Sequence, residues 1–365
     1  MMKCPLVTEL PPPPAGKTGW PWTEGALESN PGDSLAVTAV SPVGTQRGGV
    51  AAGTAATTEK GAEHPDVTGI PPSQWPRISI VIPCFNAGKY IEEAMRSVLL
   101  QGYPDVEVIL IDGGSTDQTM EIVHRYDRWL SYWVSEKDKG QSHAINKGLE
   151  HATGGLFNWF NADDIMCPGA LKLLAEPFLW HENAVAVFGA VERFDSEGNT
   201  ALLIPVTGTR EQIGNWAAPV FLPQPGGLFK KESCVRVGRI NEKLHYVMDV
   251  EFMMRLADEG QFLVVNPVTA RFRCHSDSKT QSGDIPGLVE LIAAEFNLGM
   301  ADVAQRLLER RLAGYGGLMI DQMKDEEMAA VVDRWSYLKL FRYLMRRLGR
   351  NVLLRLPGAH YKGHK

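Results

Sequence analysis

The sequence has few cysteines, and no two of them are spaced for metal or thiol chemistry. Five cysteines occur in 365 residues, without the Cys-x-x-Cys spacing that zinc sites and redox motifs use. Their scatter and odd number argue against a disulfide framework and favour free thiols in a reducing compartment. The five are Cys4, Cys84, Cys167, Cys234 and Cys274.

Long apolar runs and an excess of positive charge are also absent. No stretch reaches the roughly 18 consecutive apolar residues of a membrane span, and no apolar signal-peptide core precedes the proline run at residues 11–14. The formal net charge of −6 gives no general attraction to nucleic acid. We therefore expect a cytoplasmic protein that does not bind nucleic acid.

Two common nucleotide-binding motifs are missing as well. The sequence has neither the Gly-x-Gly-x-x-Gly pattern of dinucleotide dehydrogenases after its first strand nor a Gly-x-x-x-x-Gly-Lys-[Ser/Thr] P-loop. A sugar-nucleotide pyrophosphorylase would need a basic, glycine-rich loop after the first strand. Residues 83–88 contain no arginine, which disfavours that class of enzyme.

The first 76 residues differ in composition from the rest of the chain. They are rich in Pro, Gly, Ala, Thr and Ser and show no sustained helical or strand periodicity. This composition predicts a disordered tail over residues 1–76. Order is expected to begin at residue 77, just before the β-branched run Ile78–Ile82.

Strands and helices are predicted to alternate from residue 78 onward. Strands are expected at 78–82, 106–111, 132–134 and 156–160, with helices at 89–101, 116–126 and 141–151. This alternation predicts an α/β fold with right-handed crossovers, in which helices flank a mostly parallel sheet. Strands at 184–191 and 262–265 and a helix at 249–259 are expected to complete the same domain, over residues 77–283. Ligands then belong at the carboxyl ends of the strands.

Residues 284–365 are predicted to form a helical extension with a basic end. Residues 334–365 carry nine Lys or Arg and no Asp or Glu, with apolar residues at three- and four-residue spacing. Such a helix could lie on an anionic membrane surface. The alternative is that this helix packs its apolar face on the domain and exposes its basic face to solvent, because the same spacing of apolar residues is expected in that case.

Acidic residues follow several predicted strands. Asp112 follows the second strand, Asp163 and Asp164 follow the fourth, and Asp249 begins a helix. Taken singly, each could be a helix N-cap, because a carboxylate there accepts from unpaired backbone N–H groups. Together they suit a donor with a diphosphate, because two adjacent carboxylates need a counter-charge that Mg²⁺ or Mn²⁺ supplies through oxygen ligands. Such an ion neutralises charge on a departing diphosphate.

Six segments resemble glycosyltransferase family 2 in order and spacing, over residues 77–280. They are Pro83–Asn86, Ser97-Val98 with Gln101, Glu107–Asp112, Gly114–Asp117, Asn146–Gly148 and Asn161–Asp164. The resemblance implies a GT-A fold, inversion at the anomeric carbon and a nucleotide-sugar donor. The segment Ser135–Gly140 is similar to members that build O-antigen and other surface polysaccharides.

The resemblance also implies which residues hold the donor and the metal. The metal falls on Asp163 and His275, although a histidine after a strand is often only a hydrogen-bonded surface residue. Two positions depart from the family, since Asn161 replaces the first carboxylate of an Asp-x-Asp motif and Gly113 replaces an Asp that helps to hold uracil. The implied nucleotide-sugar contacts are Pro83, Cys84, Phe85, Asn86, Asp112, Gly114, Asp138, Asn146, Asn161, Ala162 and Asp163.

The family's catalytic base is an Asp that opens a helix. Met248-Asp249, with Arg255 and Gly260 downstream, matches that pattern except for a missing Glu. Asp249 is therefore the implied base, with an N-cap as the alternative. The sugar and acceptor loop is implied at Asp164, Gln224, Gly226 and Gly227, although its glycines could serve only a tight turn.

The sequence thus predicts a metal-dependent inverting glycosyltransferase that acts on a saccharide or lipid-linked acceptor in glycan biosynthesis. It would work in the cytoplasm, or peripherally at the inner face of a membrane through residues 334–365. The alternative is a catalytically silent member of the fold that serves as a scaffold or binding protein at the membrane. Degraded acidic positions would mark that alternative.

Overall fold

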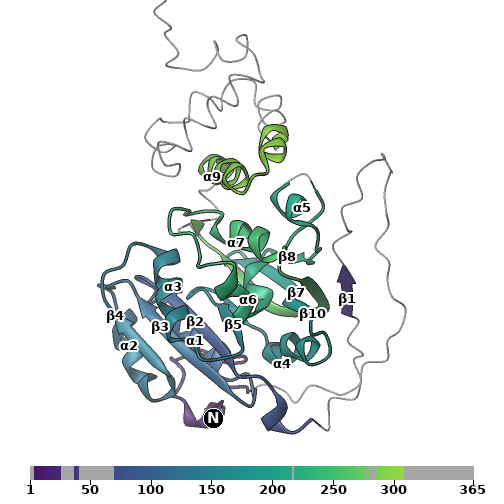
Figure 1. The fold of residues 1–365 in the computed structure, drawn as a ribbon. Helices are drawn as coiled ribbons and strands as arrows, with labels where there is room; N and C mark the ends of the chain where they lie inside the picture. Colours follow the sequence, from purple (N-terminus) through teal and green to yellow (C-terminus); the bar gives the residue numbers. More distant parts are fainter. Residues whose placement is uncertain are drawn as a thin grey trace, which may run out of the picture.

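A ten-stranded mixed β-sheet forms the middle of the molecule (Figure 1). The structure is a computed structural model, which describes residues 4–25, 37–40, 70–215, 218–276, 278–279 and 284–307. The strands are β1 (Val37–Val40), β2 (Ile78–Cys84), β3 (Val106–Asp112), β4 (Tyr132–Ser135), β5 (Leu156–Trp159), β6 (Ile165–Met166), β7 (Ala184–Asp195), β8 (Thr200–Leu203), β9 (Gly227–Lys230) and β10 (Gln261–Cys274).

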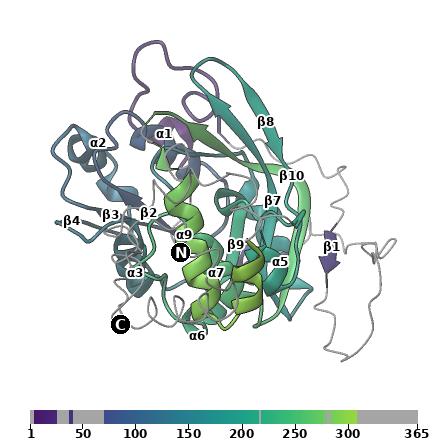
Figure 2. The ribbon, with the colours of Figure 1, turned by 90° about the horizontal axis from the view of Figure 1, so that it is seen from above.

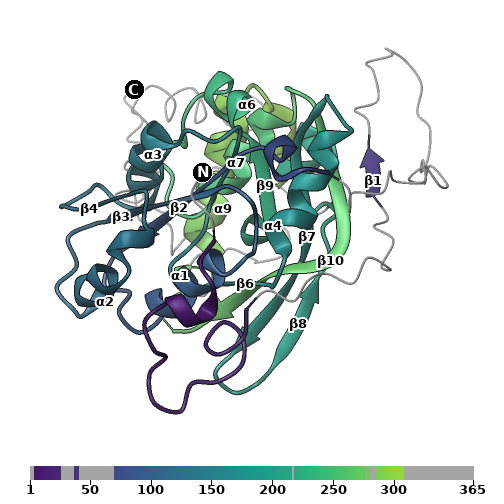
Figure 3. The same cartoon turned by 90° about the horizontal axis from the view of Figure 1, so that it is seen from below.

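Helices pack on both faces of this sheet (Figures 1 and 3). They are α1 (Ile91–Leu99), α2 (Thr119–Arg125), α3 (Gln141–His151), α4 (Ala170–Ala175), α5 (Arg210–Gly214), α6 (Lys231–Arg236), α7 (Met248–Leu256) and α9 (Asp284–Asn297). Short 3-10 turns include η3 (Pro72–Gln74), η5 (Glu176–Leu179) and η6 (Gln224–Gly226). No helix among the residues described combines the length and apolar character needed to cross a membrane.

The strand order is β1-β10-β7-β9-β5-β2-β3-β4. Strands β5, β2, β3 and β4 are parallel neighbours, as the alternation of strands and helices predicted. Strand β9 departs from this arrangement because it lies antiparallel between β5 and β7. The second half of the chain therefore extends the same sheet.

The alternation of side chains along β2 shows why two layers of helices are needed. Ile78, Ile80 and Ile82 face a core cluster that includes α1, α2 and α4, whereas Val81 faces a second cluster built with α3, α7 and α9. Successive strand residues point to opposite faces, so a strand buried on both faces reads as a continuous apolar run.

The prediction of a disordered tail is wrong for residues 4–25. Arg96 of α1 is fully buried and donates to the carbonyls of Pro11 at 2.8 Å, Pro21 at 3.0 Å and Trp22 at 2.8 Å. Trp20 donates from its indole to the carbonyl of Met166 at 2.9 Å. These contacts fix the proline-rich segment on the domain, because the buried guanidinium finds three of its acceptors there and a fourth in the hydroxyl of Tyr126, at 3.0 Å. Residues 26–36 and 41–69 lie outside the described part of the chain.

The C-terminal extension begins as predicted with a helix, α9, followed by a further helical segment over residues 301–307. Leu288, Leu291 and Ile292 of α9 pack in the same apolar cluster as Phe252 of α7. Helix α9 lies next to α7 (Figure 2). The predicted basic helix at 334–365 lies outside the described residues.

Gly148 of α3 is required by close packing. A Cβ at this position would overlap the side chain of Val81 on β2. We expect Gly148→Ala to lower the free energy of unfolding by about 1 to 3 kcal/mol, the usual cost of overpacking a core. Urea denaturation followed by circular dichroism measures this change.

Gly155 is the matched control, because a Cβ there meets no atom within 4 Å. Gly155→Ala should change stability by less than about 0.5 kcal/mol. Equal destabilisation by both alanine variants would contradict the packing explanation.

Candidate active site at the carboxyl ends of the strands

Several strands end at one edge of the sheet. Because β9 is antiparallel to both β5 and β7, these two strands run in the same direction, and β10 is parallel to β7. The turn after β5 therefore meets the residues at the end of β10, and the turn after β3 lies at the same edge of the sheet. This edge is where ligands bind in α/β sheets.

Asp112 at the end of β3 is fully buried and satisfied within the protein. Its Oδ2 accepts from the N–H of Gly114 at 3.1 Å, the N–H of Ser115 at 2.9 Å and the hydroxyl of Ser135 at 2.6 Å. Burial and the neighbouring Asp112 charge raise the pKa of the Cys84 thiol. The carboxylate shapes the loop after β3, and its predicted contact with a nucleotide stays a prediction.

Hydrogen bonds join the loop after β2 to the loop after β3. Asn86 has a left-handed backbone, with φ of 48°, and its Oδ1 accepts from the N–H of Thr116 at 2.9 Å. The hydroxyl of Ser115 in turn accepts from the N–H of Asn86 at 2.7 Å. Beside this rigid turn, which follows Pro83, the ring of Phe85 is 63% exposed. The turn thus presents a large apolar surface to solvent.

Asp138 lies against the backbone of Gly113. A Cβ on Gly113 would come within 2.9 Å of a carboxylate oxygen of Asp138, and that carboxylate accepts from the N–H of Gly140 at 2.8 Å. Gly114 adopts φ of 86°, a conformation that glycine takes without strain. The space that an Asp at position 113 would occupy is thus taken by the carboxylate of Asp138.

In the turn after β5, the two adjacent carboxylates have different surroundings. Asp164 is 1% exposed, and it accepts from the backbone N–H of Arg273 at 3.1 Å and from the amide of Asn161 at 3.2 Å. Burial and the charge of Asp163 raise the pKa of Asp164 well above its usual range. Ala162 is buried as well. Of the two carboxylates in this turn, only that of Asp163 is partly exposed to solvent.

Asp163 faces His275, the residue after β10. The carboxylate Oδ2 and the imidazole Nε2 are 3.0 Å apart, and Tyr90 packs on the imidazole with ring centroids 5.0 Å apart. The side chain of Arg273 donates to the backbone carbonyl of Asp163 at 2.9 Å and pairs with Glu93 at 2.7 Å. Strand β10 therefore holds the turn after β5 from both its backbone and its side chains.

The pair of Asp163 and His275 fits a divalent cation. Two neighbouring ligands of an octahedral ion, each about 2.1 Å from it, lie roughly 3.0 Å apart, close to the separation in the structure. One carboxylate oxygen and one imidazole nitrogen suit Mn²⁺. Among the described residues no group of three His, Cys, Asp or Glu side chains could hold an ion. Any further ligands would come from outside this pair, such as water, a bound ligand, or backbone and amide oxygens.

Asp249 is the second residue of α7 and is not its N-cap. The N-cap is Val247, and the Asp249 carboxylate accepts only the adjacent N–H of Val250, at 2.9 Å, among the hydrogen bonds found for it. Burial raises the pKa of Asp249, while the charge of Lys279 opposes that rise. A half-buried carboxylate with unused acceptor capacity is suited to take a proton.

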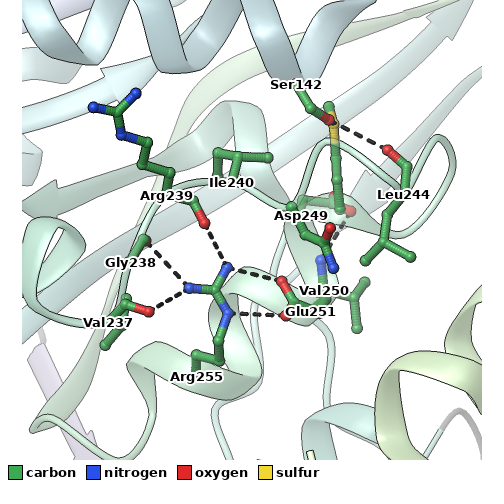
Figure 4. A network of polar contacts seen from close by, with 12 residues as sticks. Ser142, Val237, Gly238, Arg239, Ile240, Leu244, Asp249, Val250, Glu251 and Arg255 are labelled. Atoms are coloured by element: carbon green, nitrogen blue, oxygen red, sulfur yellow. Dashed lines mark hydrogen bonds and ion pairs between the residues drawn. The ribbon is translucent and has the colours of Figure 1, made fainter. Parts of the chain in front are cut away.

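Helix α7 is fixed by Arg255, one turn and a half beyond Asp249 (Figure 4). Its guanidinium pairs with Glu251 at 2.8 Å and donates to the carbonyls of Val237 at 2.6 Å and Arg239 at 2.9 Å. The Arg of the predicted pattern therefore serves to hold the helix that carries Asp249.

Lys279 connects the turn after β5 with α7. Its ammonium donates to Gln141 at 2.8 Å, and the amide of Gln141 donates to Asn161 at 2.8 Å. Charge interactions with Asp163 and Asp249 both favour the protonated form of Lys279, although burial lowers its pKa. Lys279 also donates to the carbonyl of His245 at 3.4 Å, so it joins the turn after β5 to the segment that leads into α7.

The structure gives internal partners to four other predicted contact residues. Asn146 is buried and bonds both backbone groups of Ile240, the N–H and the carbonyl each at 2.9 Å. Gln224 is buried, and its amide donates to the carbonyl of Trp159 at 2.6 Å. Gly226 and Gly227 lie so close to β7 that a Cβ on either would clash there. These four residues hold the backbone of the site in the ligand-free protein.

Sequence reasoning did not assign Gln141, Arg273 or Lys279. All three make hydrogen bonds to residues that are distant in the sequence. A local sequence pattern cannot predict such contacts. The available signal was the position of three basic residues, Arg271, Arg273 and Lys279, within four positions of His275, because charged groups that perturb one another cluster at functional sites.

Comparisons with known proteins agree with this geometry. Residues 79–234 match the family model described as Glycosyl transferase family 2. An uncharacterized glycosyltransferase of Rickettsia typhi is 25% identical over 57% of this chain and 67% of its own length. The chondroitin synthase of Escherichia coli is 26% identical over 56% of this chain but only 30% of its own length. The chain thus corresponds to part of each of these proteins.

A further relative and a solved structure extend the comparison. An uncharacterized glycosyltransferase of Haemophilus influenzae is 33% identical over 35% of this chain and 52% of its own length. The crystal structure of residues 1–349 of S. aureus TarS in complex with UDP-GlcNAc superposes with a TM-score of 0.52 over 70% of this chain and 78% of that one, at 17% identity. Residues 79–234 thus match glycosyltransferase family 2, and the sheet with its flanking helices has the GT-A fold.

Proposed function

We propose that this protein transfers a sugar from a nucleotide-sugar donor to a hydroxyl of a saccharide or lipid-linked acceptor. The observation that supports this most directly is the hydrogen-bond chain Asn161–Gln141–Lys279–His245, which joins the turn that carries Asp163 to the segment that leads to Asp249. A diphosphate leaving group and an incoming alcohol need a cation and a base at one place. The names of the relatives indicate glycan synthesis as the setting.

Asp163 and His275 would hold a divalent cation, Mn²⁺ or Mg²⁺. When bound, the ion supplies Lewis-acid stabilisation of charge on the departing diphosphate. Asp164 stays outside this ligand set, because the N–H of Arg273 and the amide of Asn161 already occupy its oxygens. Its contribution is to keep the turn in place.

Asp249 would act as the general base. Its carboxylate accepts the proton of the acceptor hydroxyl while that oxygen attacks the anomeric carbon from the side opposite the nucleotide, which inverts the configuration. A raised pKa makes Asp249 a stronger base than an exposed Asp. The charge of Lys279 opposes this rise of the pKa.

The donor would lie over the ends of β2 and β3. The exposed ring of Phe85 offers a face on which a nucleotide base can stack, and Asp138 offers a carboxylate where position 113 has none. S. aureus TarS has been crystallised with UDP-GlcNAc, so a UDP-sugar is the first donor to test. The membrane contact of residues 334–365 also stays a prediction.

A silent scaffold remains the second candidate, and the replacements at Asn161, Gly113 and Met248 favour it. A panel of nucleotide-sugars, tested with Mn²⁺ for thermal stabilisation and slow hydrolysis, separates the two. An active transferase shows both effects. Binding without any hydrolysis or transfer would support the scaffold.

Asp249→Asn is expected to reduce transfer by about two to four orders of magnitude, the range for losing a general base. Donor binding should stay nearly unchanged. Initial rates and calorimetric titration with donor measure the two quantities. Asp258→Asn, which alters an exposed Asp paired with Arg210 beyond the same helix, is the control. Transfer at the wild-type rate in Asp249→Asn would mean that the base lies elsewhere.

Asp163→Asn should abolish the thermal stabilisation that Mn²⁺ adds to a bound nucleotide, because the amide is a much weaker ligand. Asp164→Asn makes the same change at the adjacent position and should retain that stabilisation. Differential scanning fluorimetry with and without Mn²⁺ gives both results. The metal assignment fails if the two variants behave alike.

The rate of transfer should fall as the pH drops through the raised pKa of Asp249, because a protonated carboxyl cannot accept a proton. Lys279→Met removes the charge that opposes this rise, so the acidic limb of the pH profile should move to higher pH. The profile of kcat against pH measures it. Lys243→Met, at an exposed lysine on the preceding loop, should leave the limb in place. A limb that stays fixed in both variants contradicts the predicted coupling.

A further inference from the structure

Glu290 of α9 binds the segment that leads into α7. One carboxylate oxygen accepts from the N–H of His245 at 2.8 Å, and the other accepts from Tyr246 at 2.6 Å and from Val247 at 3.2 Å. Glu290 is 2% exposed. A single buried side chain therefore satisfies three consecutive backbone donors.

These three donors lie just before the first turn of α7. A helix leaves its first four N–H groups without partners, and a polar side chain at the N-cap usually satisfies one of them. The N-cap here is Val247, which has no side-chain acceptor. From another helix, Glu290 satisfies the N–H of Val247 itself, with a negative charge that the positive end of the α7 dipole favours.

The same segment is held on its other side by Lys279. The ammonium donates to the carbonyl of His245 at 3.4 Å, whereas the N–H of His245 binds Glu290. Charge interactions link Lys279 to Glu290 and also to Asp249. The segment that leads into α7 is thus held between the carboxylate of Glu290 and the ammonium of Lys279. It lies immediately before Asp249, the residue proposed as the base.

Apolar packing alone does not explain a glutamate at this position. Leu288, Leu291 and Ile292 already join α9 to the cluster that contains Phe252. Burying a carboxylate costs free energy unless hydrogen bonds offset it. The carboxylate at 290 therefore adds something that the apolar contacts do not supply, namely a fixed position for the backbone of 245–247.

We propose that Glu290 is a positioning residue for Asp249, a role that rests on the proposed function of Asp249 as the base. The carboxylate sets the direction in which the first turn of α7 leaves the loop, and with it the place of the second helical residue. Glu290 lies outside residues 79–234, which match the family model. The C-terminal extension would then be part of the catalytic machinery.

Glu290→Gln tests this role, because the amide keeps the shape but turns an N–H₂ group toward backbone donors. We expect kcat to fall about tenfold to a hundredfold, the effect of misplacing a reacting group by roughly 1 Å. The donor dissociation constant should stay within about twofold, since the donor contacts lie on β2, β3 and the turn after β5. Amide hydrogen exchange at 245–250 should be at least about tenfold faster.

Glu295→Gln is the matched control, with the same substitution at another fully buried glutamate of the same helix. It should leave both kcat and exchange at 245–250 near the wild-type values. If Glu290→Gln does not fold, Glu290→Asp keeps the charge on a shorter stem and should show the same changes in smaller measure.

The outcomes are distinct. Unchanged kcat with faster exchange, or an equal loss of kcat in both Gln variants, would overturn the positioning role. If the wild-type protein transfers no sugar at all, the proposed function fails, while exchange at 245–250 still reports whether Glu290 fixes α7. Unchanged exchange in Glu290→Gln would then overturn the inference by itself.

Discussion

The site depends on how strand β10 compensates the acidic turn after β5. Two adjacent carboxylates at the end of a buried strand repel each other, and burial disfavours their charge. The backbone N–H of Arg273 and its side chain hold Asp164 and the carbonyl of Asp163, and His275 faces the Asp163 carboxylate. Because this strand also pairs with β7, the sheet and the site are completed by the same element.

Much of the fold could be predicted from the sequence, and the reason is local. Apolar runs bounded by turn residues specify strands, and helix α3 occupies the predicted residues 141–151 because Gly140, with φ of 113°, ends the preceding loop. The roles of Asn146 and Gln224 could not be predicted. Both are polar side chains whose partners lie more than 60 residues away, and a motif cannot distinguish a ligand contact from a backbone contact.

Composition misled the prediction for the N-terminal segment. Prolines and glycines reduce helical and strand periodicity, yet their free carbonyls are good acceptors. A single buried arginine, Arg96, binds three of them, and Leu10, Trp20 and Trp22 add apolar contact. A low-complexity segment can therefore be ordered when a folded domain offers it a buried cation and an apolar surface.

The distance along the chain between Asp164 and its partner Arg273 has a consequence for biosynthesis. The two residues are 109 positions apart, so a ribosome releases the acidic turn long before β10 exists. Until then the nascent chain carries two uncompensated carboxylates at the edge of an incomplete sheet, and late, long-range pairings of this kind slow folding. A chain that terminates before residue 273 would present this edge permanently, as a target for chaperones or proteases.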